Sequence, residues 1–158
     1  MSEIVKCFDT NDDINAIRHE VFMQEQGISY TDEFEGDEDS FIHFCCYRNG
    51  LLIGYIRVSI SNDEIHIGRL AVRKRFRKQG IGTKLMATAE KFGRENTCKI
   101  ASLNAQIQAK GFYAKLGYIE CGDTFLEANI EHILMKKHLV RKRGFCPSSK
   151  QWNVCLSQ

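Results

Sequence analysis

The chain has 158 residues, a nearly balanced formal charge of +2 at pH 7, and 43% hydrophobic residues. This length fits one domain that buries its own core. The balanced charge gives no overall reason to expect nucleic acid as a partner, and no apolar run reaches the roughly 18 residues that cross a membrane. Seven cysteines without a Cys-x-x-Cys pair, and an N-terminus without an apolar signal segment, predict free thiols, no metal site and a cytoplasmic protein.

The first 40 residues predict a strand, a helix and a loop. Residues 4–8 form the strand, and residues 10–13 offer side chains that cap a helix N-terminus. Apolar residues then recur at helical spacing, so the helix is expected to run to about Gln26. The acidic stretch that follows, up to Ser40, has no periodicity and is expected to be a loop.

Three strands follow as an antiparallel meander. Residues 41–47 and 51–60 are strand-like, and the Asn49-Gly50 pair between them is a strong signal for a two-residue hairpin. Residues 64–72 form the third strand.

The third strand contains a change of phase. Ile65 and Ile67 are apolar at odd positions, whereas Leu70 and Val72 are apolar at even positions. Because side chains in a strand alternate between faces, this change predicts one extra residue, a β-bulge, near Gly68-Arg69. Such a bulge bends the strand and ends its pairing with the next one. A strand buried on both faces is the alternative.

The second half predicts two helices and three strands. The helices span residues 80–95 and 105–116, and the strands span residues 99–103, 118–121 and 131–136. The whole order predicts an α/β fold with a mixed, mostly antiparallel sheet of six or seven strands and helices on both faces. We expect one domain over residues 1–138 and a basic, flexible tail over residues 139–158.

The segment between the third strand and the next helix carries the clearest chemistry. The strand ends at Val72, a basic loop contains Arg77 and Lys78, and a helix opens at Gly80. The first turn of a helix has unpaired N–H groups, and glycines there let a phosphate approach the backbone closely. The pattern favours a pyrophosphate site over a basic turn before an ordinary helix.

This loop resembles the acetyl coenzyme A signature of the GCN5-related N-acetyltransferases, the GNAT superfamily. The signature reads Arg/Gln-x-x-Gly-x-Gly/Ala, here Arg77, Gly80 and Gly82, and residues 112–118 resemble the second motif of the family. The resemblance covers roughly residues 3–138 and implies the GNAT fold. Similarity to the ElaA-like and YjcF-like branch lies at Arg18, Val21-Phe22, Glu25-Gln26, Asp32-Glu33, Ile67-Gly68-Arg69, Ala105-Gln106, Phe112-Tyr113, Glu127 and His132.

The resemblance implies acetyl coenzyme A as co-substrate. Backbone groups of Leu70 and Val72 are expected to pair with its pantetheine arm, and the amides of residues 77–83 to hold its pyrophosphate. The implied binding residues are Leu70, Ala71, Val72, Arg77, Lys78, Gln79, Gly80, Ile81, Gly82, Thr83, Gln106 and Phe112.

By the same resemblance, an amine attacks the thioester directly in a ternary complex. Tyr113 matches the family position that donates a proton or a hydrogen bond to the departing sulfur, although a packing tyrosine is the alternative. A backbone N–H near Ala71 or Val72 is expected to polarise the carbonyl.

The general base is open, because Gly68 and Arg69 stand where several family members carry a carboxylate. An exposed alkyl amine has a pKa of about 10 and must lose a proton before it attacks. His66, on the same strand, is the catalytic candidate. Further candidates are Glu25, His43, His132 and a water chain.

The implied activity is an N-acetyltransferase acting on a primary amine of a small molecule, of amino-sugar, polyamine or amino-acid type. The expected substrate residues are Glu25, Arg69, His43 and His132. Arg69 either binds an acidic substrate group or pairs with the acidic residues 32–39. A protein or peptide acetyltransferase and a non-catalytic acyl coenzyme A-binding module are the alternatives. No nucleic acid or membrane partner is expected, and the oligomeric state stays open, a homodimer included.

Overall fold

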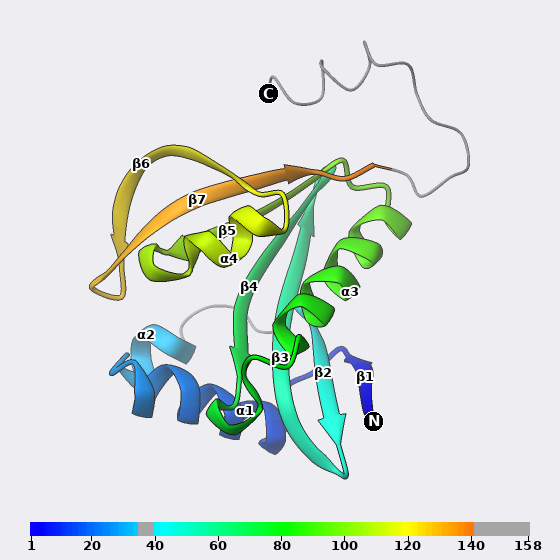
Figure 1. Ribbon diagram of the computed structural model, residues 1–158, viewed down its shortest axis with the longest axis vertical. Coiled ribbons are helices and arrows are strands. Elements are labelled where there is room, and N and C mark those ends of the chain that lie inside the picture. The colour runs from blue at the N-terminus through cyan, green and yellow to red at the C-terminus, as the bar shows by residue number, and fades with distance from the viewer. Residues whose placement is uncertain (35–39, 141–158) are drawn as a thin grey trace.

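A computed structural model describes residues 1–34 and 40–140 of the chain. Its centre is a seven-stranded sheet in the order β1-β2-β3-β4-β5-β7-β6 (Figure 1). The strands are β1 Ser2–Cys7, β2 Ile42–Arg48, β3 Leu51–Ser61, β4 Glu64–Val72, β5 Ile100–Gln106, β6 Ile119–Glu127 and β7 Ile130–His138. The helical elements are α1 Asp12–Arg18, η1 His19–Glu25, α2 Tyr30–Phe34, η3 Lys74–Phe76, α3 Ile81–Glu95, η4 Ile107–Ala109 and α4 Lys110–Lys115.

Only β4 and β5 pair in parallel, and all other neighbouring strands are antiparallel. The predicted mixed, mostly antiparallel sheet is therefore confirmed. Two hydrophobic clusters lie on its two faces. The helices α3 and α4 contribute to the larger cluster, and α1 with η1 forms the smaller one, so helices cover both faces as predicted. Most of the predicted tail, from residue 141 onward, lies outside the described residues.

The predicted bulge is present in β4. Tyr55 of β3 pairs with Ala71 and Arg57 pairs with Gly68, so two residues of β4 stand opposite one residue of β3. Arg69 has a positive φ of 53°, which is uncommon for a residue with a side chain. Pairing between β4 and β5 covers only Glu64–Ile67 and Ile100–Leu103, so beyond it the two strands separate.

The N-terminal helical segment differs from its prediction in two ways. Asn11 caps α1 through a 2.9 Å bond from the Ile14 N–H, but from His19 onward the helix continues as a π-helix, η1. The predicted loop up to Ser40 was wrong in its first part, because α2 forms at Tyr30–Phe34. Ser29 starts this helix, since its hydroxyl accepts from the Asp32 N–H at 3.2 Å.

The last two strands are longer than predicted. A tight turn at Ala128 and Asn129, with φ of 50° and 61°, joins β6 to β7 and extends both strands toward it. Gln106 at the end of β5 pairs with His132 of β7. This register places the β6–β7 turn beside the opening between β4 and β5. Among the described residues, no helix is long and apolar enough to cross a membrane.

Candidate active site

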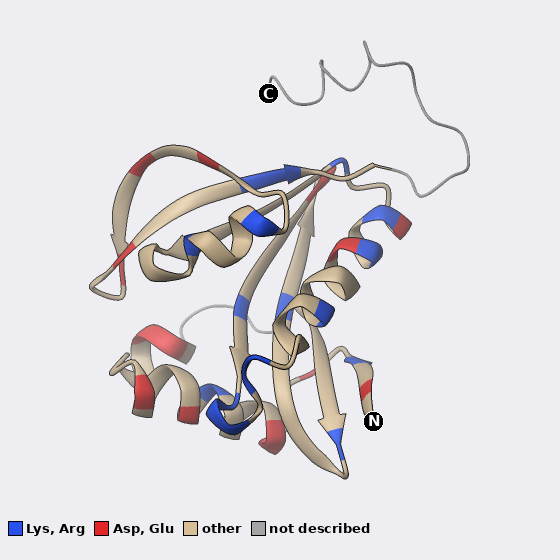
Figure 2. Ribbon diagram, in the orientation of Figure 1, with Lys and Arg blue, Asp and Glu red and all other residues tan. Residues whose placement is uncertain are grey.

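The loop after β4 is built to receive an anionic group. Lys78 and Gly80 have positive φ of 63° and 80°, which turns the chain sharply into α3. The helix begins at Ile81 and runs for 15 residues, so its first amides point out of the helix at the positive end of its dipole. Figure 2 shows Lys and Arg gathered in this loop, beside acidic residues of the α1–α2 segment.

Two ion pairs tie the basic loop to η1. Arg73 Nη1 lies 2.7 Å from the Glu20 carboxylate, and Arg77 Nη2 lies 2.9 Å from both oxygens of Glu25. Arg77 Nε also donates to the Val72 carbonyl at 2.8 Å. Lys78, by contrast, has no ion-pair partner within the described part of the chain, so its charge remains for a ligand.

A cavity of about 630 Å³ opens at this loop, and we call it the donor cavity. Of the residues assigned to acetyl coenzyme A by resemblance, all except Gln79 and Gln106 line it. Gln79 instead accepts a hydrogen bond from Arg48 at 2.8 Å. Glu25 was expected to bind the acceptor substrate, but it lines the donor cavity, where it forms an ion pair with Arg77.

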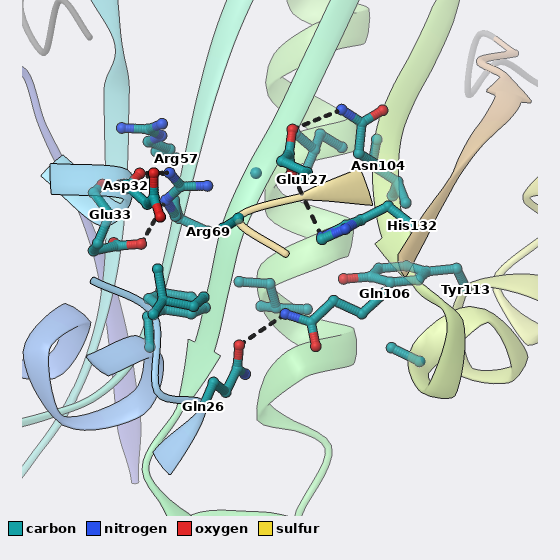
Figure 3. Close-up of a pocket in the computed structure, with 18 residues that line it drawn as sticks. Gln26, Asp32, Glu33, Arg57, Arg69, Asn104, Gln106, Tyr113, Glu127 and His132 are labelled. Carbon is teal, nitrogen blue, oxygen red and sulfur yellow. Dashed lines mark hydrogen bonds and ion pairs between the residues drawn. The ribbon is translucent and has the colours of Figure 1, made fainter. Parts of the chain in front are cut away.

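A second cavity of about 510 Å³ adjoins the first, and we call it the acceptor cavity (Figure 3). Both cavities are lined by Gln26, Leu70, Ala109 and Tyr113, so the boundary between them passes through these residues. Gln106 Nε2 donates to Gln26 Oε1 at 2.7 Å and thereby bridges the cleft between β5 and the N-terminal segment.

Tyr113 stands where the two cavities meet. Its ring packs edge-on against Phe112 and Tyr118, at centroid distances of 5.1 and 6.1 Å. Burial raises the pKa of Tyr113 to about 12. The hydroxyl therefore stays protonated at neutral pH and is a permanent hydrogen-bond donor.

One wall of the acceptor cavity holds Asn104, Glu127 and His132, and we call it the histidine wall. His132 Nδ1 lies 2.7 Å from the Ile130 carbonyl, which only accepts, so Nδ1 carries a proton. Its Nε2 faces Glu127 Oε2 at 3.5 Å, and Asn104 donates to Glu127 Oε1 at 3.4 Å. With Nδ1 committed to the carbonyl, Nε2 is the ring nitrogen that lies beside a carboxylate.

The opposite wall, which we call the arginine wall, is formed by Asp32, Glu33, Arg57 and Arg69. Glu33 is only 1% exposed, and its carboxylate contacts Arg18 Nε at 2.7 Å and Arg69 Nε at 2.9 Å. Burial raises the pKa of Glu33, although the neighbouring arginines oppose this effect. The expectation that Arg69 pairs with the acidic segment is met at Glu33.

The two remaining predicted histidines lie away from Tyr113. His66 lines a third cavity of about 390 Å³, where its Nδ1 is 2.7 Å from the Ser102 hydroxyl. His43 is fully buried in β2 and bonds the Tyr55 hydroxyl through Nδ1. Neither lines the donor or the acceptor cavity.

Several residues of the acceptor cavity were not predicted as site residues: Gln26, Glu33, Arg57, Asn104 and Glu127. No local signal marks Asn104 and Glu127, because only the register of β5, β6 and β7 brings them together with His132. The Ser29-x-x-Asp32 capping pattern was the signal for α2, which carries Glu33.

Comparisons with known proteins agree with this architecture. The model of the acetyltransferase (GNAT) domain family matches residues 10–139. The N-acetyltransferase YjcF of Bacillus subtilis, itself uncharacterized, is 32% identical over 122 residues, which are 77% of this chain and 87% of YjcF. Escherichia coli ElaA has a TM-score of 0.75 at 26% identity, covering 87% of this chain and 99% of ElaA.

A more distant structure supports the fold alone. An aminoglycoside 6'-N-acetyltransferase in complex with coenzyme A has a TM-score of 0.71 at 17% identity, covering 89% of this chain and 99% of that chain. The family match over residues 10–139 and the similarity to YjcF show that the chain belongs to the GNAT family and is an acetyl coenzyme A-dependent N-acyltransferase.

Proposed function

We propose that the chain transfers the acetyl group of acetyl coenzyme A to the primary amine of a small molecule held in the acceptor cavity. The observation that carries this proposal is the meeting of the donor and acceptor cavities at Tyr113. One cavity is lined by the glycine loop and the first turn of α3, and the other by polar side chains. An acetyl donor and an amine bound there meet at this residue.

The donor cavity fits acetyl coenzyme A in its charge and in its space. Lys78 and the amides of the first turn of α3 suit the pyrophosphate. At Gly82 a Cβ atom would lie 3.3 Å from the Phe112 ring, so the glycine keeps this part of the cavity open. Leu70 and Val72 lie beyond the β4–β5 pairing, where their backbone groups suit the pantetheine amides. When bound, acetyl coenzyme A supplies a thioester that an amine attacks directly.

Tyr113 is proposed to donate a hydrogen bond to the sulfur of the leaving group. Its pKa of about 12 lies well above the value of about 8.5 for an ordinary thiol, so full proton transfer to a thiolate is unfavourable. A hydrogen bond that strengthens as negative charge develops on the sulfur lowers the barrier without this transfer.

His132, with Glu127, is proposed as the general base. An alkyl ammonium must lose a proton before it attacks. His132 lines the acceptor cavity, and its Nε2, with a carboxylate 3.5 Å away, is the ring nitrogen available to accept that proton. Glu127 attracts the ammonium and then stabilises the imidazolium that forms. His66 does not line this cavity, so it is the weaker candidate.

A small molecule suits the size of the acceptor cavity, because about 510 Å³ lies within the usual range of small-ligand sites. A peptide acceptor is the second candidate. The acceptor cavity shares Ile67, Leu103 and Asn104 with the third cavity, so a longer acceptor has room to continue along the β4–β5 seam.

The test measures donor binding and turnover separately. Acetyl coenzyme A at millimolar concentration should raise the Tm of the protein, and amines should release free thiol in a coupled assay. A panel of amino sugars, polyamines and amino acids is compared with lysine-rich peptides. No thermal shift would overturn the donor assignment, and acetylation confined to peptides would favour the second candidate.

A further inference from the structure

The acceptor cavity carries two different kinds of chemistry on its two walls. Figure 3 shows Asn104, Glu127 and His132 on one side and Asp32, Glu33 and Arg69 on the other. The histidine wall adjoins Tyr113 and offers a carboxylate and an imidazole, which suit an amine. The arginine wall contains the guanidinium of Arg69, a group that suits an anion.

Arg69 is held in a fixed orientation on its wall. The bulge gives it a φ of 53°, its Nε lies 2.9 Å from Glu33 Oε2, and its Nη2 reaches the Asp32 and Glu33 carbonyls at 3.4 and 3.3 Å. A guanidinium has five N–H groups. Within the described residues only Nη2 donates hydrogen bonds, and the buried Nε lies close to Glu33 without hydrogen-bond alignment. The side chain is 25% exposed, so Nη1 remains for a ligand.

Arg69 shares its Glu33 partner with a second arginine. The same carboxylate also contacts Arg18, which is fully buried. The shared pairing holds Arg69 in place, so binding an anion costs little additional ordering of the side chain. Asp32 also belongs to this wall, but its side chain is exposed.

We propose that Arg69 binds an anionic group of the acceptor, so that preferred acceptors carry a carboxylate or phosphate group as well as the amine. This inference rests on the proposed function. The amine lies at the histidine wall beside Tyr113, and the acidic group lies at the arginine wall. Polyamines and simple alkylamines are then poor acceptors, because they bring no anion to Arg69.

Acceptors matched in length test this inference in the wild-type protein. We would compare 5-aminopentanoate with pentylamine and 1,5-diaminopentane, and aminoethyl phosphate with ethanolamine, at saturating acetyl coenzyme A. An acceptor without an acidic group cannot make the hydrogen-bonded charge contact with Arg69. Each acid-bearing acceptor should therefore exceed its partner without an acidic group in kcat/KM by about 10-fold or more. The carboxylate and phosphate arms show which acidic group is preferred.

Variants at Arg69 assign the effect to this side chain. Arg69→Gln should remove most of the preference for acid-bearing acceptors, measured as the ratio of kcat/KM for 5-aminopentanoate to kcat/KM for pentylamine, whereas Arg69→Lys should retain part of this preference. Arg75→Gln is the control, since Arg75 is exposed and lines neither cavity. The Tm of each variant shows whether it folds. The wild-type comparison does not depend on any variant.

Calorimetry with pentanoate and pentylamine as probes separates this inference from the proposed function. Tighter binding of pentanoate to the wild type than to Arg69→Gln is expected, even without turnover. If pentanoate does not bind, or if the diamine is acetylated as well as the amino acid, the inference is wrong, and the proposed function stands as long as an amine of the panel releases thiol. If pentanoate binds at Arg69 and no amine in either panel releases thiol, the proposed function fails instead.

Discussion

Tyr113 lies at the junction of the two cavities, and a conservative substitution tests its role. Tyr113→Phe keeps the ring packing against Phe112 but removes the only polar atom of the side chain. Turnover should fall about tenfold or more, while the affinity for coenzyme A stays within about twofold. Steady-state kinetics and calorimetric titration of coenzyme A measure the two effects, and an unchanged kcat would leave Tyr113 with a packing role only.

The pKa of Tyr113 also sets the alkaline side of the pH profile. Tyr113 acts in its protonated form, and burial raises its pKa to about 12, so this form persists through the range in which an acceptor amine with a pKa of about 10 loses its proton. We therefore expect kcat/KM to rise with pH and then level off, with no decline before about pH 10. A decline between pH 8 and 9 would contradict the hydrogen-bond donor role.

His132 provides the matching test on the acid side of the profile. His132→Gln and Glu127→Gln should lower kcat/KM near neutral pH by about 100-fold, and higher pH should restore much of the loss, because the free amine then forms in solution. The exposed His19, changed to Gln, is the control. If His66→Gln abolishes turnover and His132→Gln does not, the base role belongs to His66.

The donor residues were predictable because they are contiguous in the sequence, whereas the residues of the histidine wall are not. Residues 77–83 follow one another in a strand–glycine–helix pattern that has its own physical meaning. Glu127, His132 and Asn104 come from three strands and meet only through the register of β5 with β7 and of β7 with β6. A local pattern does not fix that register, so Glu127 and Asn104 were not predicted as site residues.

Among the elements, α3 ties the donor loop to the sheet, and two glycines test this link. A Cβ at Gly54 would lie 2.7 Å from Ile81 Cγ2, at the start of α3, and a Cβ at Gly93 would lie 2.8 Å from Ile65 Cγ2, near its end. Either glycine changed to Ala should overpack the core. Each change should lower the free energy of unfolding by about 1–3 kcal/mol and the Tm by several degrees.

Only one of the two changes should reach the donor site. Gly54→Ala displaces Ile81, which lines the donor cavity, so the affinity for coenzyme A should fall about tenfold. Gly93→Ala acts near the far end of the same helix and serves as the matched control, with affinity within about twofold. Equal losses in both variants would indicate general loosening of α3 instead.

The elements predicted best from the sequence are those whose conformation is determined by neighbouring residues in the chain. The bulge in β4 follows from the change of phase between Ile67 and Leu70, because alternation in a strand leaves one residue over. The π-helix η1 has no such cause, since its apolar spacing also fits an α-helix. The length of β6 and β7 depends on the Ala128-Asn129 turn, and Ala is not a residue that favours positive φ.

At the scale of the whole molecule, β7 and the residue after it are tied to the core. Leu139 donates its N–H to the Lys99 carbonyl at 2.8 Å and packs on the larger core cluster. Lys137 pairs with Ala101 in the sheet, and its ammonium lies 2.8 Å from the mostly buried Glu90. These contacts extend slightly past the predicted boundary at residue 138.

Two truncated chains test where the domain ends. A chain that ends at Val140 keeps all of these contacts, so we expect its Tm to stay within about 2 °C of the full chain and its turnover within about twofold. A chain that ends at Lys136 loses the last pairs of β7 and leaves Glu90 without the Lys137 ammonium, so its Tm should fall by roughly 10 °C or more. Thermal unfolding and thiol release measure both chains. If the Val140 chain loses turnover while keeping its Tm, residues 141–158 contribute to the reaction and the domain does not end at β7.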